Sequence, residues 1–163
     1  MEQRVHTKGV TQMTHQNNHN IYDIAFYCVY VANKNEKYIT NVDLQIILYM
    51  LQERYIEKHH EPLFFAPIEP DTDMPRIKNI YYRFAGYGAM EIKPCDEQLE
   101  NFNTAHSLGT DIALFIEVTL TEYVNTPKWD VSKFFDYEGS AYRICKETGR
   151  NDITSFLQKE FNT

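Results

Sequence analysis

A chain of 163 residues has the length of a single domain, and a domain of this size can bury a sizeable core. Hydrophobic residues make up 43% of the chain and charged residues 24%, which are ordinary globular values and exclude wholesale disorder. Lys and Arg number 16 against 23 Asp and Glu, and the resulting net charge of −7 argues against direct binding to nucleic acid or to an anionic membrane.

Residues 1–19 are rich in Gln, Asn, Thr and His and show almost no apolar periodicity, which predicts a flexible leader. This stretch lacks the apolar core of a signal peptide, and no apolar run approaches the ~18 residues that a membrane helix needs. We therefore expect a cytoplasmic protein whose helical domain covers residues 20–163.

Two helices are expected before the middle of the chain. Apolar residues at helical spacing predict the first over 20–33. A second begins at Thr40 or Asn41 and ends near His59, and its wide apolar face places it at the centre of the domain. Residues 61–70 hold three prolines, which exclude a helix interior and predict an extended loop that can include one edge strand.

The second half of the chain continues the helical pattern. Pro75 fits the first position of a third helix, which Gly86 and Gly88 end. Weak amphipathic spacing over 95–106 and stronger spacing over 110–124 predict further helices, followed by short helical segments in 130–135 and 140–146 and a closing helix over 153–161. The fold class is therefore mainly α: a compact single helical domain of about six helices, with a short extended or β-hairpin-like segment between helices two and three.

No combination of side chains in the sequence has the spacing of a catalytic or metal site. The pair His59–His60 would point about 100° apart at a helix end, and Asp71-x-Asp73 lacks the further oxygen ligands of a calcium loop. His106, Ser107 and Cys145 can be written as a nucleophile with a base, but the sequence does not bring them together. Cys28, Cys95 and Cys145 form no CxxC pair. We expect no enzyme activity, no metal and no cofactor.

Aromatic residues make up 14% of the chain and favour a ring-rich core and a contact surface. Arg76, Lys78 and Arg83 form a basic stretch beside Tyr81 and Tyr82, which fits a partner-binding or solvated face better than a nucleic-acid surface in so acidic a chain. A second group is most simply core, although interleaved acidic residues leave room for an acidic aromatic surface: Trp129, Phe134, Phe135, Tyr137 and Tyr142.

Residues 39–52 read Ile-Thr-Asn-Val-Asp-Leu-Gln-Ile-Ile-Leu-Tyr-Met-Leu-Gln. They resemble the signature Ile-Thr-Asn-x-x-Leu-Gln-Lys-Leu-Leu-Tyr-x-x-Gln of the Panacea family, which comprises SocA-like and GepA-like phage-associated proteins. Further pieces follow in family order, among them the stretches 22–25, 62–64, 80–88 and 138–142, so that the resemblance covers about residues 20–161. The signature positions are expected to lie mainly in the core: Leu44, Gln45, Leu48, Tyr49 and Gln52.

The chain departs from the family pattern at three places. Ile46 replaces a Lys, residues 68–75 replace an aromatic Trp-x-Tyr-Gly-Pro-Val stretch, and Phe135-Asp136 replaces Thr-His before the acidic residue. These departures indicate a divergent member, and the changed loop puts a shared partner in doubt. The resemblance implies a small helical antitoxin or proteolytic adaptor of phages and other mobile elements, without a catalytic centre.

The function expected from the sequence is that of a non-enzymatic protein-binding module, either an antitoxin that neutralises a cognate toxin or an adaptor that delivers it to a protease. The alternative is a phage-encoded inhibitor of a host defence system that uses the −7 charge to mimic nucleic acid. A small hydrolase is a third reading, and the oligomeric state stays open. The partner-binding candidates are Phe64, Phe65, Arg76, Tyr81, Tyr82, Arg83 and Tyr87.

Overall fold

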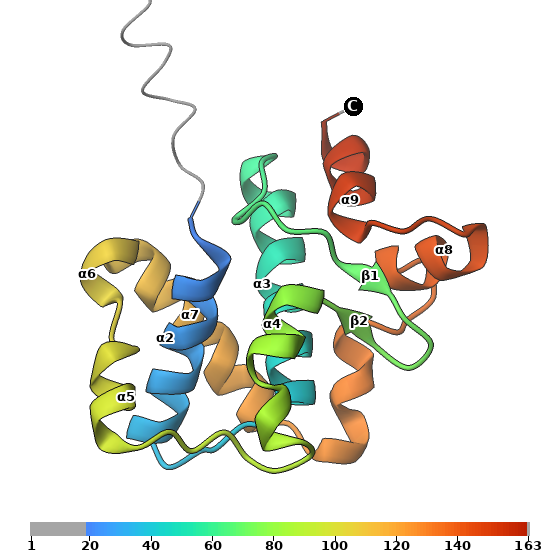
Figure 1. The fold of residues 1–163 in the computed structure, drawn as a ribbon. Helices are drawn as coiled ribbons and strands as arrows, with labels where there is room; N and C mark the ends of the chain where they lie inside the picture. Colours follow the sequence, from blue (N-terminus) through green and yellow to red (C-terminus); the bar gives the residue numbers. More distant parts are fainter. Residues whose placement is uncertain (1–18, 163) are drawn as a thin grey trace, which may run out of the picture.

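The computed structural model of the chain describes residues 19–162, and Figure 1 shows helices packed around one central helix. These residues form eight α-helices, two 3-10 helices and one two-stranded sheet, which confirms the mainly helical class. The expected number of about six helices was too low. The weak helical pattern over 95–106 corresponds to two short helices, because the first helix ends at Phe102 and the second begins after Thr104.

The predicted leader falls almost wholly outside the described residues. His19 is its one described member, and the His19 backbone N–H donates to the carbonyl of Leu63 over 3.1 Å. Helix α2 then covers Ile21–Lys34, and the Asn20 side chain caps it by accepting from the Tyr22 N–H at 2.8 Å. The domain begins where the apolar periodicity begins.

Helix α3 covers Asn41–His59 and forms the centre of the fold. Thr40 and Asp43 make a reciprocal capping box at its start, and His60 ends it in the left-handed conformation with a φ of 60°. Leu44, Leu48 and Leu51 are fully buried, as the wide apolar face predicted. Helices α2, α7 and α9 and strand β2 all pack around α3.

The proline-rich segment after α3 is extended and leads into a small hairpin. Strand β1 is Glu69–Pro70 and strand β2 is Pro75–Arg76, and they pair antiparallel with Glu69 opposite Arg76. Pro75 therefore lies in a strand, and its expected place at the start of a helix was wrong. Helix α4 covers Lys78–Arg83 instead, and it begins only after β2 has completed its pairing with β1.

The remaining elements close the domain. A 3-10 helix, η1, covers Ala85–Tyr87, and α5 (Asp96–Asn101) and α6 (Ala105–Leu108) follow it. Helix α7 covers Thr110–Val124, the 3-10 helix η2 Lys128–Phe134, α8 Ala141–Thr148 and α9 Ile153–Phe161. One cluster of buried side chains extends from Ile21 to Leu157, so all the α-helices except α5 contribute to a single core. No helix within residues 19–162 has the length and apolar character required to cross a bilayer.

Candidate protein-contact surface

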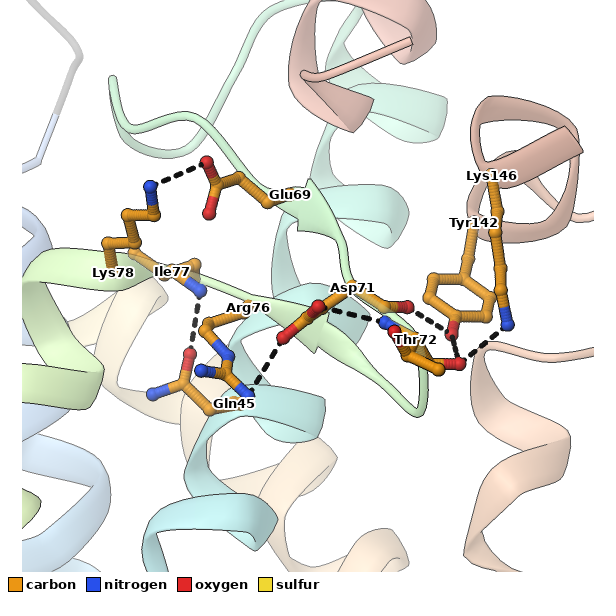
Figure 2. A network of polar contacts seen from close by, with 9 residues as sticks. All are labelled: Gln45, Glu69, Asp71, Thr72, Arg76, Ile77, Lys78, Tyr142 and Lys146. Atoms are coloured by element: carbon orange, nitrogen blue, oxygen red, sulfur yellow. Dashed lines mark hydrogen bonds and ion pairs between the residues drawn. The ribbon is translucent and has the colours of Figure 1, made fainter. Parts of the chain in front are cut away.

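Two buried glutamines on α3 fix the extended segment that holds three of the seven expected partner residues, Phe64, Phe65 and Arg76. The Gln52 side-chain oxygen accepts from the backbone N–H groups of Leu63 and Phe64, at 2.8 and 3.3 Å, and its Nε2 donates to the Phe64 carbonyl at 2.8 Å. Gln45, two turns earlier on the same face, accepts from the Ile77 N–H at 2.7 Å (Figure 2). Both ends of the segment are thus tied to the central helix.

The signature positions Leu44, Gln45, Leu48, Tyr49 and Gln52 all lie in the core, as expected. The hydrogen bonds of Gln52 also correct one expected partner residue. Phe64 is fully buried, because the Gln52 amide draws its backbone against α3 and the ring enters the core. Phe64 therefore cannot contact a partner without partial unfolding. Its neighbour Phe65 points outward, with 70% of its surface exposed.

The side chains of Arg76 and Tyr81 make their contacts within the domain, at the β1–β2 hairpin. The Arg76 guanidinium lies 4.3 Å above the Tyr81 ring and binds the Asp71 carboxylate at 2.8 Å, as Figure 2 shows for the ion pair. On the other side of the hairpin the Tyr142 hydroxyl donates to the Asp71 carbonyl at 2.7 Å. Both side chains of the expected contact site are therefore engaged within the domain.

The basic stretch is largely neutralised. Arg76 pairs with Asp71, and the Lys78 ammonium lies 3.2 Å from the Glu69 carboxylate (Figure 2). Arg83 is exposed, and its guanidinium stacks over the rings of Phe26 and Phe102 at 5.2 and 5.9 Å. Two of the three cations of the basic stretch are therefore paired within the domain, and the third, Arg83, packs over aromatic rings.

The seven expected partner residues do not form one patch. Phe65 adjoins α9, where it lines a hollow with Asp152 and Gln158. Tyr82 is 67% exposed on α4, whereas Tyr87 is half-buried on η1 with its ring 6.4 Å from that of Phe84. Of the candidate aromatic residues, Tyr82 and Phe65 alone present a large free surface.

A different grouping emerges around the N-terminus of α3. Eight large apolar side chains are exposed within the described part of the chain, and four of them lie here. Their exposed fractions are 45% for Val42, 67% for Tyr82, 75% for Met90 and 83% for Trp129. We call these four residues the end surface.

Hydrogen bonds hold each of these segments to the first turn of α3. The Asn41 amide donates to the Tyr81 carbonyl at 2.9 Å, which holds α4 to the start of α3. Thr40 forms an isolated antiparallel bridge with Glu91, the residue after Met90. Lys128, the residue before Trp129, binds the Asp43 carboxylate at 2.5 Å. The end surface is therefore assembled from α3 itself and from three other segments that are held to its start.

Asp43 is the electrostatic centre of this arrangement. Its carboxylate is 5% exposed and accepts from the Thr40 N–H at 2.8 Å, the Tyr123 hydroxyl at 2.7 Å and the Lys128 ammonium. Burial alone would raise the pKa of Asp43, but these donors outweigh burial and hold the pKa below its ordinary value. The ionised carboxylate thus joins α3, α7 and η2.

Sequence reasoning missed Val42 and Met90 of the end surface. Trp129 was expected mainly in the core, with an acidic aromatic surface as the alternative, and it lies exposed on η2 between the charged residues Lys128 and Asp130. Val42 is the one exposed apolar residue in the first three turns of α3. Met90 carries no sequence signal, because only the bridge of Glu91 to Thr40 brings it to this place.

The residues considered for chemistry are spread over the fold. The His59 ring packs on Tyr55 with centroids 4.3 Å apart, and His60 Nδ1 lies 2.7 Å from the Phe161 carbonyl oxygen. Cys145 is buried on α8, and burial raises its pKa. Between residues 19 and 162 no three His, Cys, Asp or Glu side chains are placed to share a metal ion.

The other sequence candidates have local structural roles. Ser107 on α6 donates to the Thr104 carbonyl at 2.9 Å and not to the neighbouring His106. The Asp71 carboxylate accepts from the Thr72 N–H at 2.9 Å, as expected for a turn. Gly88 has a φ of 58° just after η1 and ends that helical segment. None of these groups is arranged as a nucleophile with its base.

One half-buried carboxylate, that of Glu53, lies apart from these candidates. Glu53 accepts from the Tyr49 hydroxyl at 2.6 Å and from the Tyr137 hydroxyl at 3.3 Å. Burial raises the pKa of Glu53 against the opposing effect of the two hydroxyls, and it raises the pKa of Tyr137 to about 12. This cluster joins α3 to the segment between η2 and α8.

Comparison with known proteins adds no relative: no protein-family model, no curated protein and no solved structure matches the chain.

Proposed function

We propose that this chain is a protein-binding module and that the end surface is its principal contact site. The observation that carries the proposal is the gathering of four exposed apolar side chains, two of them Trp129 and Tyr82, around the first turn of α3. Trp and Tyr are the residue types that most often dominate binding energy at interfaces. Exposed apolar side chains that gather in one region of a protein surface are a feature of interaction sites.

The rigidity of the site supports the same reading. Tyr82 and Trp129 are presented by short helical segments that Asn41 and Asp43 tie to the central helix. A preformed contact surface loses little conformational freedom on binding, so more of the contact energy appears as affinity. Lys128 and the other charged groups at the edge of the end surface provide the polar rim that interfaces usually have.

The finer proposal is that the partner is a cognate toxin, with the chain acting as its antitoxin or as an adaptor that delivers it to a protease. Its support is the resemblance of residues 39–52 and of the later stretches to the Panacea signature. The alternative proposal, an inhibitor of a host defence protein, is favoured by the net charge of −7. The two differ in the salt dependence of binding, which is steep for a nucleic-acid mimic and shallow for an apolar contact.

The experiment is co-expression of the chain with the product of the adjacent gene, followed by co-purification and a growth assay. We expect a complex and rescue of growth, both lost in Trp129→Ala and retained in Phe65→Ala, a matched control on another exposed aromatic residue. Melting temperatures of both variants should stay close to that of the wild type, because both side chains are exposed. Neither complex nor rescue with the wild-type chain would contradict the proposal.

A further inference from the structure

Two buried amide side chains of α3 are bonded to each other and hold α4, the helix that carries Tyr82. Asn41 and Gln45 lie one turn apart on the same face of α3 and are 3% and 0% exposed. The Gln45 amide nitrogen donates to the Asn41 amide oxygen at 3.2 Å. Gln45 also accepts from the Ile77 N–H at 2.7 Å (Figure 2), and Asn41 donates to the Tyr81 carbonyl at 2.9 Å. We call these three hydrogen bonds the amide relay.

The amide relay satisfies backbone groups at both ends of α4. The first N–H groups and the last carbonyls of a helix lack partners within the helix. Ile77 is the N-cap residue of α4, and Tyr81 lies in its last turn, so α3 supplies an acceptor at one end and a donor at the other. Both amides must therefore point the same way along the relay, with each oxygen accepting and each nitrogen donating.

The orientation of α4 depends on this relay. The helix has six residues, too few for a helix that is stable by itself, and Ile80 is its buried residue. The flanking residues Ile77 and Phe84 are also buried. Apolar burial holds these side chains in the core without specifying a direction, whereas hydrogen bonds restrict angles as well as distances. The relay bonds at Ile77 and Tyr81 thus fix the rotation of α4 that apolar packing leaves loosely defined.

The position of Tyr82 follows from that of α4. The Tyr82 side chain is 67% exposed, and its ring meets the Tyr81 ring nearly at a right angle with centroids 6.0 Å apart. The Tyr81 ring lies in turn 4.3 Å from the Arg76 guanidinium. The direction of the Tyr82 ring is therefore set by the α4 backbone and by Tyr81, the residue whose carbonyl the relay holds.

We propose that Asn41 and Gln45 are positioning residues of the end surface: through the amide relay they set the orientation of α4 and so present Tyr82 to the partner. The inference rests on the proposed function, in which Tyr82 contacts the partner. A side chain held in its bound direction loses less conformational freedom on binding, and large aromatic contacts contribute most when they are well packed. Loss of the relay should therefore weaken binding, although both amides are buried and do not touch the partner.

The first test compares two substitutions in the full chain that each leave a buried backbone group without its partner. Gln45→Leu removes the acceptor of the Ile77 N–H and breaks the relay. Thr154→Val is the matched control, because Thr154 is 5% exposed on α9 and its hydroxyl donates to the Ala66 carbonyl at 3.0 Å, outside the relay. At a temperature where both variants are folded, calorimetric titration with the co-purified partner should show about tenfold weaker binding for Gln45→Leu and unchanged affinity for Thr154→Val.

Two further measurements separate positioning from general damage. In a double-mutant cycle, Gln45→Leu should have little additional effect on affinity once Tyr82→Ala is present, because Gln45 acts through Tyr82. In the free protein, residual dipolar couplings of the α4 amide groups report the orientation of α4 relative to α3. They should change in Gln45→Leu and in Asn41→Leu, which breaks the relay at its other end, and should match the wild type in Thr154→Val.

The outcomes distinguish the positioning role from the proposed function. Additive effects in the cycle, equal weakening by Gln45→Leu and Thr154→Val, or unchanged α4 couplings in both relay variants would each overturn the positioning role and leave Tyr82 as a contact residue. Failure of the proposed function has a different signature: the wild-type chain forms no complex, or Tyr82→Ala binds as tightly as the wild type. The role of the relay in binding then falls with it, whatever the α4 couplings show.

Discussion

Replacing Gln52 with Leu should destabilise the domain more than most single substitutions, although the two side chains have similar volumes. Gln52 is fully buried, and its amide satisfies the N–H groups of Leu63 and Phe64 and the carbonyl of Phe64. Each buried backbone group left without a partner costs about 1–3 kcal/mol, so three such groups give about 3–6 kcal/mol after partial relaxation. A domain of this kind has about 5–15 kcal/mol of total stability.

Urea unfolding followed by far-ultraviolet circular dichroism measures this loss, and amide exchange at Leu63 and Phe64 locates it. Because the Gln52 variant can lose most of its stability, Gln45→Leu provides a milder second case. It leaves one backbone N–H, that of Ile77, without its acceptor and should cost about 1–3 kcal/mol. Gln98→Leu on the exposed face of α5 is the matched control, with an expected change within about 0.5 kcal/mol. Losses below about 0.5 kcal/mol in both buried variants would refute the argument.

Three further predictions concern charge and contact. The folded pKa of Asp43 lies below its unfolded value of 3.8. The ionised carboxylate therefore contributes its full stabilisation above pH 3.8 and loses it as the pH falls through the folded pKa. When Asp43→Asn and the wild type are unfolded over an acid pH series, the difference between their unfolding free energies should shrink as the pH falls. Glu53 has the opposite effect on the pH dependence of stability, because its folded pKa is raised: the unfolding free energy should increase as the pH falls from neutral towards the unfolded pKa of Glu53. Glu53→Gln, measured at the same pH values, should lack this increase. Tyr82→Ala should weaken partner binding by more than about 1 kcal/mol in titration calorimetry with an unchanged melting temperature, and a parallel loss of stability would show a structural role instead.

Much of the fold could be predicted from sequence because its signals are local. Helix α7 at Thr110–Val124 and helix α9 at Ile153–Phe161 have the expected bounds, since apolar spacing and flanking turn residues act over a few positions. The start of α3 is also set locally, because Thr40 forms its capping box with Asp43, three residues further along the chain.

The misassigned features depend on contacts between distant residues. Pro75 suits the first turn of a helix as well as an edge strand, and the pairing of β2 with β1 decides between them. Phe64 looks like an exposed loop residue until Gln52 is seen to hold its backbone. The end surface could not be found locally, because Asn41, Thr40 and Asp43 each recruit a different segment to it.

The most direct test of the protein-binding proposal uses the fact that Trp129 is the single tryptophan in the chain. Biosynthetic labelling with fluorotryptophan gives one fluorine NMR signal, from Trp129 of the end surface. Because Trp129 is 83% exposed in the free domain, this signal should respond to exchange of H₂O for D₂O. On binding of the co-purified partner we predict that the signal moves and loses that solvent response. A complex in which the Trp129 signal keeps its position and its solvent response would contradict the account.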